Sequence, residues 1–319
     1  MQRRGFLVLG LGAALALAGC ARRLHEADLG GAGDPPATEP DPATEPPEPS
    51  EPPEPPSAEA SPGPKPERGH DAEHHTASGT EPAAPDELQL DPGFADADPQ
   101  EWGERVTGVR TRLDTTEPVV ALSFDACGGG SGSGYDTVLI DHLRAAAVPA
   151  TLFVNARWIE ANPGVFDELA SDPLFEVENH GTEHRPLSVD GRSAYGIRGT
   201  RSVDEVVDEV MINQRLITDL TGRAPRLFRS GTAYYDEVAV RIVEMLGLRV
   251  AGFDVLGDAG ATFSAGQVEA ALLSASPGSI ALLHMNHPGS GTAAGVGAAI
   301  PALRARGWSF VRLSEHDLV

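Results

Sequence analysis

Two histidines, His180 and His184, lie four positions apart in the polar stretch formed by residues 178–184. Neutral imidazole is the commonest protein ligand for a borderline metal ion such as zinc. Side chains at this spacing project to the same side of a helix or of a tight turn. The pair can therefore offer two nitrogens to one ion. The alternative interpretation is two surface histidines in a polar loop.

Other side chains able to do chemistry follow the apolar, β-rich runs of the sequence. In chain order, the positions at the ends of these runs are Asp125, His180, Arg229, Asp254 with Asp258 behind it, and His284 with His287 in reach. Carboxylates and imidazoles together can transfer protons and hold a metal ion, and a guanidinium can orient a carboxylate. A fold that gathers these run ends at one rim would bring the side chains into one site.

Strands and helices alternate in our prediction for residues 101–319. Strands are expected at 119–124, 150–154, 174–177, 226–228, 248–253, 279–283 and 308–313, and helices at 136–147, 163–171, 202–222, 236–246, 264–275 and 292–306. This alternation predicts an α/β fold with parallel pairing and right-handed crossovers. About seven such units predict a closed or nearly closed (β/α) barrel, in which chemistry gathers at the C-terminal ends of the strands. An open doubly wound sheet is the alternative.

Common site motifs of other enzyme classes are missing from the sequence. The glycine-rich stretch 128–134 lacks the Lys-Ser/Thr of a phosphate-binding loop, and no dinucleotide fingerprint follows the first predicted strand. No Gly-x-Ser-x-Gly elbow is evident, which weighs against a serine esterase. We interpret residues 128–134 as a mobile loop beside the site.

Residues 1–20 have the pattern of an export signal. The basic start with Arg3 and Arg4 resembles a twin-arginine signal, and the apolar run 6–18 is too short to span a membrane. Residues 17–20 resemble a bacterial lipobox, in which the chain is cut before Cys20 and the thiol is lipidated. An ordinary secretory signal is the alternative. We expect an exported protein, lipid-anchored to the bacterial membrane through Cys20 and facing the periplasm or the cell exterior.

Residues 21–100 are rich in Pro and Glu and predict a disordered, extended tether. Proline removes backbone donors, and the carboxylates repel one another. The net charge of -23, part of which comes from this segment, argues against nucleic-acid binding. The chain has only two cysteines, Cys20 and Cys127, so no disulfide framework is indicated.

From about Pro118 to the C-terminus the sequence resembles the polysaccharide deacetylases of the NodB-homology type, carbohydrate esterase family 4. Residues 123–127 correspond to the family's first motif, Thr-Phe-Asp-Asp-Gly, and residues 180–184 to its second, His-(Ser/Thr)-x-x-His. Residues 229–234 correspond loosely to the third motif, Arg-x-x-Pro-Tyr, and residues 282–284 to the Leu-x-His motif. The resemblance implies a distorted (β/α) barrel and the metal-dependent removal of N- or O-acetyl groups from chitin-like glycans, peptidoglycan or xylan.

The resemblance also implies roles for individual residues. His180 and His184 would hold a divalent metal, in the first place zinc, with cobalt, nickel or manganese as alternatives. Asp125 would act as the general base and His284 as the acid that protonates the departing amine or alcohol. Arg229 would orient a carboxylate, unless it is only a structural ion-pair partner.

An acid behind the fifth predicted strand is expected to assist this chemistry. We expect Asp254 or Asp258 to hold the second ring nitrogen of His284. The alternatives are that both acids cap the loop and that His284 is a core histidine.

The first motif departs from the family at one position. Where the family has a second, metal-binding Asp, this chain has Ala126. The metal would then be held by His180, His184 and Asp125, with the base role moved elsewhere. Alternatively Cys127 supplies a thiolate, which zinc accepts readily, or it is only a small buried thiol. In a third alternative, metal binding is weak and the protein is a glycan-binding relic.

Taken together, the sequence predicts a hydrolase that acts on carbon-nitrogen bonds other than peptide bonds or on acetyl esters. The expected partner is a polysaccharide or peptidoglycan of the cell envelope or exterior. The alternatives are a catalytically inactive carbohydrate-binding lipoprotein of the same fold and a structural envelope lipoprotein.

Overall fold

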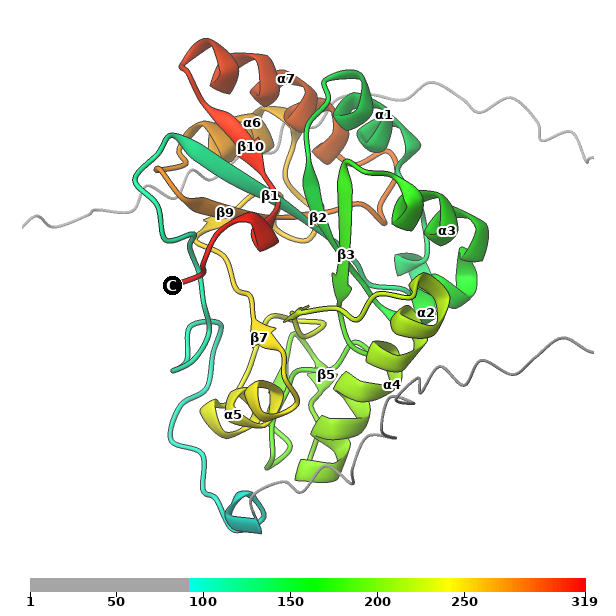
Figure 1. The fold of residues 1–319 in the computed structure, drawn as a ribbon, viewed down its shortest axis with the longest axis vertical. Coiled ribbons are helices and arrows are strands. Elements are labelled where there is room, and N and C mark those ends of the chain that lie inside the picture. Colours follow the sequence, from blue (N-terminus) through cyan, green and yellow to red (C-terminus); the bar gives the residue numbers. More distant parts are fainter. Residues whose placement is uncertain (1–91) are drawn as a thin grey trace, which may run out of the picture. The chain divides into compact units, whose positions relative to one another are not determined.

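The central element of the domain is the strand β1 (Val119–Ala126), which is buried along its whole length. A strand that is apolar on both faces is typical of a parallel sheet covered on both sides. In this computed structural model, which describes residues 92–319, β9 (Ser279–His284) and β2 (Ala150–Val154) both pair with β1 in parallel (Figure 1). The export signal predicted at 1–20, and the predicted tether as far as residue 91, lie outside the described residues.

The sheet is curled and parallel throughout. Seven strands follow one another in the order β7-β6-β3-β2-β1-β9-β8, and β10 also pairs with β1. The bounds of the strands not yet given are β3 Phe175–Asn179, β6 Leu227–Phe228, β7 Arg249–Val250, β8 Val255–Leu256 and β10 Ser309–Val311. The two strands at the ends of this order, β7 and β8, do not pair with each other, so the sheet stays open and forms a half-barrel. The predicted α/β fold with a distorted barrel of about seven strands is confirmed.

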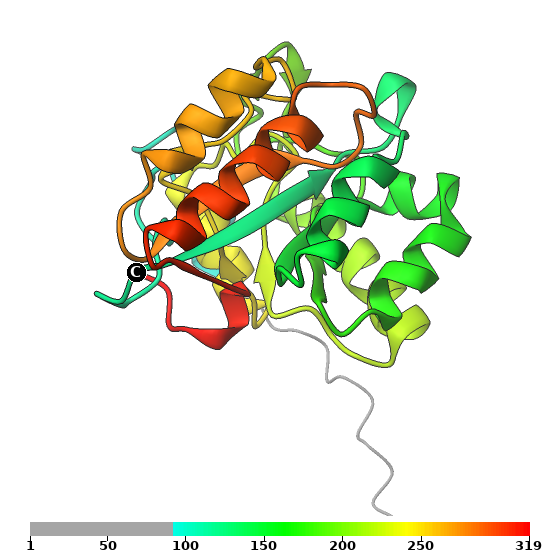
Figure 2. The same ribbon diagram turned by 90° about the horizontal axis from the view of Figure 1, so that it is seen from above.

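Seven α-helices lie in the described part of the chain, and most begin at a capping side chain. They are α1 Thr137–Ala145, α2 Ala156–Ala161, α3 Pro163–Ser171, α4 Val203–Thr221, α5 Glu237–Met245, α6 Ala265–Leu273 and α7 Thr292–Ala305. Ser202 caps α4 by accepting a hydrogen bond from the Glu205 N–H, and Gly222 ends the helix at a φ of 68°. Helices α6 and α7 lie side by side (Figure 2). No helix of residues 92–319 has the length and apolar character needed to cross a bilayer.

Side chains alternate along β1 between two core clusters. Val120, Leu122, Phe124 and Ala126 pack in the cluster that includes residues of α1, α6 and α7. Val119 and Ala121 belong to the second cluster, which also holds Leu113 and other residues from the N-terminal part of the domain. Because neighbouring residues of a strand point to opposite faces, Ser123 and Asp125 continue the second row, on the inner face of the half-barrel. Ala126 therefore points away from that inner face.

The predicted strand 248–253 is wrong, because the chain divides there into two short strands. β7 ends at Val250 and β8 begins at Val255. The Arg110 N–H donates to the Val250 carbonyl, and the Gly252 N–H donates to the Arg110 carbonyl. A segment far earlier in the chain therefore takes the pairing positions next to β7. Helix α2 and the hairpin of β4 (Ser193–Ala194) and β5 (Ile197–Arg198) were not predicted.

Glu178 of β3 predicts a pH dependence of stability. Its carboxyl accepts the N–H groups of Arg226 and Leu227 at 2.8 and 2.7 Å. Burial nevertheless raises its pKa from 4.5 to about 8. The folded chain therefore keeps this proton over a pH range in which the unfolded chain has lost it. We expect the free energy of unfolding to fall as pH rises from about 4.5 to about 8, by up to several kcal/mol.

Denaturant unfolding of the full chain at several pH values measures this dependence. The variant Glu178→Gln keeps an acceptor oxygen for both N–H groups but has no proton to lose, so its stability should fall less steeply over the same range. Equal slopes in the two proteins would show that Glu178 is not the group responsible.

Candidate active site

Asp125 and Arg229 form a buried ion pair on the inner face of the half-barrel. Arg229 Nη1 donates to Asp125 Oδ1 at 2.8 Å, and the arginine side chain is fully buried. The guanidinium also donates to the Ser123 hydroxyl and to the carbonyl oxygens of Ala251 and Gly252 at 3.0 to 3.1 Å. These bonds fix the orientation of the Asp125 carboxylate and leave its Oδ2 without an arginine partner. Oδ2 lies 3.6 Å from His180 Nε2.

His180 directly follows β3 and is fully buried. Its Nδ1 lies 3.0 Å from the Arg229 carbonyl oxygen. A carbonyl can only accept, so Nδ1 carries the hydrogen, and the neutral ring presents a lone pair at Nε2. Burial lowers the pKa of His180, but the Asp125 carboxylate and Cys127 outweigh it, and the net shift is upward. Nε2 lies 3.8 Å from Cys127 Sγ.

The loop between the two histidines is held by Glu209 of α4. Its carboxylate accepts hydrogen bonds from the N–H groups of Thr182, Glu183 and Arg185 at 3.0 to 3.1 Å. Burial raises the pKa of Glu209, and the N–H groups that it accepts act in the opposite direction. We did not single out Glu209 from the sequence. The sequence feature that could have identified Glu209 is its position next to Val210 on the buried face of the predicted helix.

His184 is brought back to His180 by a tight turn rather than by a helix. Its φ of 62° lies in the left-handed region, which costs free energy for a residue other than glycine. The two imidazole centroids are 5.1 Å apart. A Cβ on Gly231 would lie 2.4 Å from the His184 backbone, so the close packing here requires glycine at 231. His184 Nε2 is buried and has no hydrogen-bond partner among the described residues.

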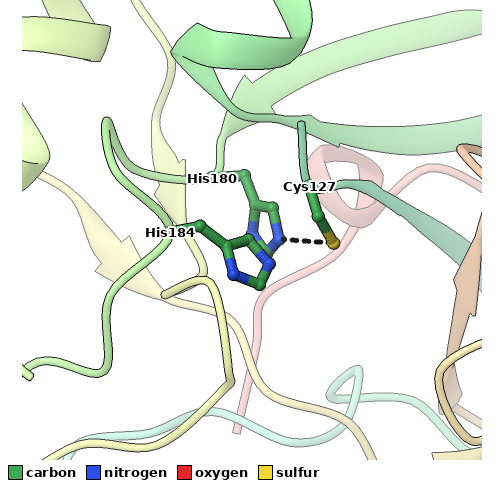
Figure 3. A group of neighbouring side chains, drawn as sticks. All are labelled: Cys127, His180 and His184. Carbon is green, nitrogen blue, oxygen red and sulfur yellow. Dashed lines mark hydrogen bonds between the residues drawn. The ribbon is translucent and has the colours of Figure 1, made fainter. Parts of the chain in front are cut away.

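Cys127 completes a group of three metal-ligating side chains with the two histidines. One ligand atom from each of Cys127, His180 and His184 lies within 4.8 Å of the others, and the three side chains point toward one another (Figure 3). Burial raises the pKa of the Cys127 thiol, but the histidines 184, 180 and 284 more than compensate and bring it well below its usual value. The donor types and the unpartnered nitrogen of His184 both fit a divalent metal such as zinc. Asp125, predicted as a ligand, binds Arg229 through Oδ1 and lies outside this group of three, and its role as a ligand stays a prediction.

His284 ends β9 and forms a second acid–imidazole pair with Asp258. His284 Nδ1 donates to Asp258 Oδ1 at 2.8 Å, and the His284 N–H and the Thr292 hydroxyl donate to Oδ2 at 2.7 and 2.9 Å. Burial lowers the pKa of His284, but the Asp258 carboxylate and Cys127 raise it well above its ordinary value. The ring is therefore held in one orientation, and its protonated form is favoured.

The expectation that Asp254 lies at this rim is wrong. Asp254 is bound to the Arg112 guanidinium, the Ser279 hydroxyl and the Ile280 N–H, at the start of β9. His284, by contrast, is at the end of the same strand. Of the two acids considered from the sequence, Asp258 is the partner of His284. The difference follows from the division of the predicted strand 248–253, which places Asp254 before β8 rather than after a strand.

A cavity of about 360 Å³ opens next to these groups, and Asp125, His184 and His284 all line it. Tyr195 of the turn between β4 and β5 lines the same cavity and is 72% exposed. Its ring meets that of Tyr234 edge-on at 5.3 Å. An exposed aromatic ring beside a cavity is suited to stacking on a sugar. Trp158 and Tyr235, by contrast, are fully buried core residues.

Comparison with known proteins agrees with this architecture. Residues 112–251 match the sequence family described as polysaccharide deacetylase. Solved structures that share the fold include PdaA of Bacillus subtilis, a family 4 carbohydrate esterase, with 20% identity, 66% of this chain and 84% of that chain covered, and a TM-score of 0.55. They also include a family 4 acetyl xylan esterase from Clostridium thermocellum in complex with cobalt, with 24% identity, 62% and 89% coverage, and a TM-score of 0.51.

A third structure with this fold is a pseudoenzyme of carbohydrate esterase family 4 from Bacillus anthracis. It has 20% identity to this chain, covers 65% of this chain and 67% of its own, and has a TM-score of 0.54. A mutant of that pseudoenzyme is described as having restored enzymatic activity. The family match over residues 112–251 confirms the resemblance to polysaccharide deacetylases that we found in the sequence.

Glu209 should contribute measurably to stability through the loop that carries His184. The variant Glu209→Ala leaves three N–H groups without their acceptor, so we expect a loss of about 2 to 4 kcal/mol in the free energy of unfolding. Denaturant unfolding of the full chain measures this loss. Asp208→Ala, on the exposed side of the same helix, is the matched control and should change stability by less than about 0.5 kcal/mol. Equal effects of the two variants would contradict a role for Glu209 in holding the loop.

Proposed function

We propose that this chain, whose residues 112–251 match the polysaccharide deacetylases, is a metal-dependent hydrolase that removes acetyl groups from a cell-envelope or extracellular polysaccharide. The observation that supports this most strongly is the shared cavity. Asp125, fixed by Arg229, and His284, fixed by Asp258, line it together with His184. A base, an acid and a metal-binding histidine are the groups that such a hydrolysis needs.

The metal in this proposal is zinc in the first place, with cobalt, nickel or manganese as alternatives. His180 and His184 would hold it, because one nitrogen of each ring is free of a strong hydrogen-bond partner and both face Cys127. A bound divalent ion supplies a Lewis acid for the acetyl carbonyl and for the attacking water. The carbonyl of Arg229 fixes the tautomer of His180 that can act as a ligand.

Asp125 is suited to take the proton from the attacking water. Its Oδ1 is occupied by Arg229, and its Oδ2 faces His180 and the cavity. The arginine holds the carboxylate in one orientation, so no rotation is needed before proton transfer. Arg229 therefore acts on Asp125 and is not placed to touch the substrate itself.

His284 is suited to protonate the departing amine or alcohol. Asp258 holds its Nδ1, so its Nε2 is the atom that gives the proton. The raised pKa favours the protonated form of the ring. Tyr195, which lines the same cavity, offers an exposed ring against which a sugar can stack.

The proposal places this hydrolase outside the cytoplasm. It would be attached to the membrane by lipidated Cys20, with the predicted tether letting the domain reach a polysaccharide or peptidoglycan substrate. This part rests on the sequence of the N-terminal segment alone. The tether was predicted at 21–100, but residues 92–100 belong to the folded domain, because Phe94 packs in the second core cluster and the Gln100 N–H donates to Glu237.

A second candidate function is that of a catalytically inactive carbohydrate-binding lipoprotein. Ala126 at the position of a family metal ligand favours it, as does the likeness in fold to a pseudoenzyme. It is the weaker candidate, because the pairs Asp125–Arg229 and His284–Asp258 are both intact. A binding protein has no use for a fixed base and a protonated acid on one cavity.

Hydrolysis of an acetylated chito-oligosaccharide and of a chromogenic acetyl ester by the full chain tests the proposed activity. We expect hydrolysis that a chelator abolishes and that added zinc restores. His180→Ala should lose several kcal/mol of transition-state stabilisation, more than about a hundredfold in rate. His316→Ala, which lies outside the site, is the control. A rate that is insensitive to chelator and unchanged in His180→Ala would contradict the mechanism, and saccharide binding without hydrolysis would favour the second candidate.

The role of Asp258 predicts a change in the pH dependence of hydrolysis. Asp258→Asn removes the charge that raises the pKa of His284, so the acid loses its proton at lower pH. Activity that needs protonated His284 should therefore decline at lower pH in this variant than in the natural chain. Asp254→Asn, at the other end of β9, should leave the profile unchanged. If activity in Asp258→Asn declines at the same alkaline pH as in the natural chain, His284 is not the acid.

A further inference from the structure

We propose that the Cys127 thiolate is the third protein ligand of the metal, in place of the carboxylate that polysaccharide deacetylases carry one residue earlier. The proposal rests on the metal-dependent function given above and deepens it, because it assigns the ligand set and the metals that the site prefers. The ion would be held by Cys127, His180 and His184.

The direction of the side chains along β1 explains why the ligand moves by one residue. Ala126 packs in the same apolar cluster as Val154 and Trp158, on the face of the sheet away from Asp125. Strand alternation returns the following residue, Cys127, to the inner face that carries Asp125. A carboxylate at position 126 would therefore lie among apolar side chains, which is costly. At position 127 a thiol already faces the histidines.

The separations among the three donor atoms suit one tetrahedral ion. Bonds of about 2.3 Å from zinc to sulfur and about 2.0 to 2.1 Å to nitrogen place the sulfur about 3.6 Å from each nitrogen. Cys127 Sγ lies 3.8 Å from His180 Nε2, and all three ligand atoms lie within 4.8 Å of one another. An ion can therefore bind with only small shifts of the side chains.

The surroundings of the group favour a ligand over a small buried thiol. A structural cysteine packs among apolar atoms, whereas Cys127 faces imidazole rings. His184 Nε2 is buried and has no partner among residues 92–319, a state that costs free energy unless a ligand satisfies the atom. Three protein ligands would leave one position of a tetrahedral ion free for water or substrate, and one of the three, His184, lines the cavity.

A thiolate ligand changes which metals the site selects. Thiolates bind zinc and cobalt well and bind hard ions such as magnesium and manganese poorly. We therefore expect the site to prefer zinc and cobalt over manganese. A carboxylate in the same position would weaken that preference.

The absorption spectrum of the cobalt-loaded full chain tests the proposal without any activity measurement. We expect about one equivalent of Co²⁺ and a sulfur-to-cobalt charge-transfer band in the near ultraviolet. Cys20→Ser removes the only other cysteine of the chain and should keep the band. Cys127→Ser should lose the band and bind Co²⁺ roughly tenfold more weakly or worse. Cys127→Asp, which offers a carboxylate, should bind Co²⁺ without the band. Binding by this variant would show that the band is lost because the sulfur is gone and not because the chain is unfolded.

A second measurement uses the reactivity of the thiol. In the Cys20→Ser protein, Cys127 is the sole cysteine, so iodoacetamide should label it in the metal-free chain and should not label it once zinc is bound. Equal labelling with and without zinc would contradict a sulfur–metal bond.

The outcomes separate this proposal from the function on which it rests. If the chain binds Co²⁺ through the histidines but shows no charge-transfer band, Cys127 is not a ligand, and the metal-dependent function stands. If the natural chain binds neither zinc nor cobalt, both proposals fail together. A chelator-insensitive hydrolysis that iodoacetamide abolishes would also overturn the proposal, because Cys127 would then act without a metal.

Discussion

The site depends on one buried guanidinium. Arg229 binds Asp125 and Ser123 of β1 through its side chain, and its own carbonyl accepts the Nδ1 hydrogen of His180. It thereby links the end of β1, the loop after β3 and the segment after β6 in one network. A charge buried this completely is tolerated only when its hydrogen bonds are satisfied, and removing either partner of such a pair typically costs 3 to 5 kcal/mol. The position of the base and the tautomer of a metal ligand are thus fixed by the same residue.

The second constraint is the turn that carries His184. His184 has a left-handed backbone conformation, and its backbone packs closely against Gly231. Such a turn is unfavourable in an isolated peptide. Glu209 provides the compensation, because its carboxylate collects three N–H groups that would otherwise be buried without an acceptor. The strain is therefore maintained by α4, a helix that contributes no group to the chemistry itself. Rigid support of this kind keeps a ligand in place before the ion arrives.

Much of this arrangement could be predicted from the sequence, because local patterns determine it. The capping residue Ser202 and the left-handed Gly222 delimit α4, and the apolar run of β1 identifies the central strand. The alternation of elements predicted that Asp125 and His284 lie at one rim of the sheet, and the structure places them in register on adjacent parallel strands. These inferences need only propensity, periodicity and the known geometry of parallel sheets.

The remainder depends on contacts between distant parts of the chain. Residues near Arg110 divide the predicted strand 248–253, and so Asp254 lies at the wrong end of β9 for a role in the site. The function of Glu209 depends on a loop some 25 residues earlier, and sequence periodicity shows only that it faces inward. Asp125 is held by Arg229 while Cys127 also faces the histidines, and this arrangement depends on contacts between distant parts of the chain that no local pattern reveals.

The central claim is that the group of Cys127, His180 and His184 binds one metal ion. Elemental analysis of the full chain, purified without chelator and compared with His184→Ala, tests it most directly. We predict close to one equivalent of zinc or cobalt in the natural chain and little in the variant, because His184 Nε2 has no other partner among the described residues. A natural chain that remains free of metal even after incubation with zinc would contradict the account.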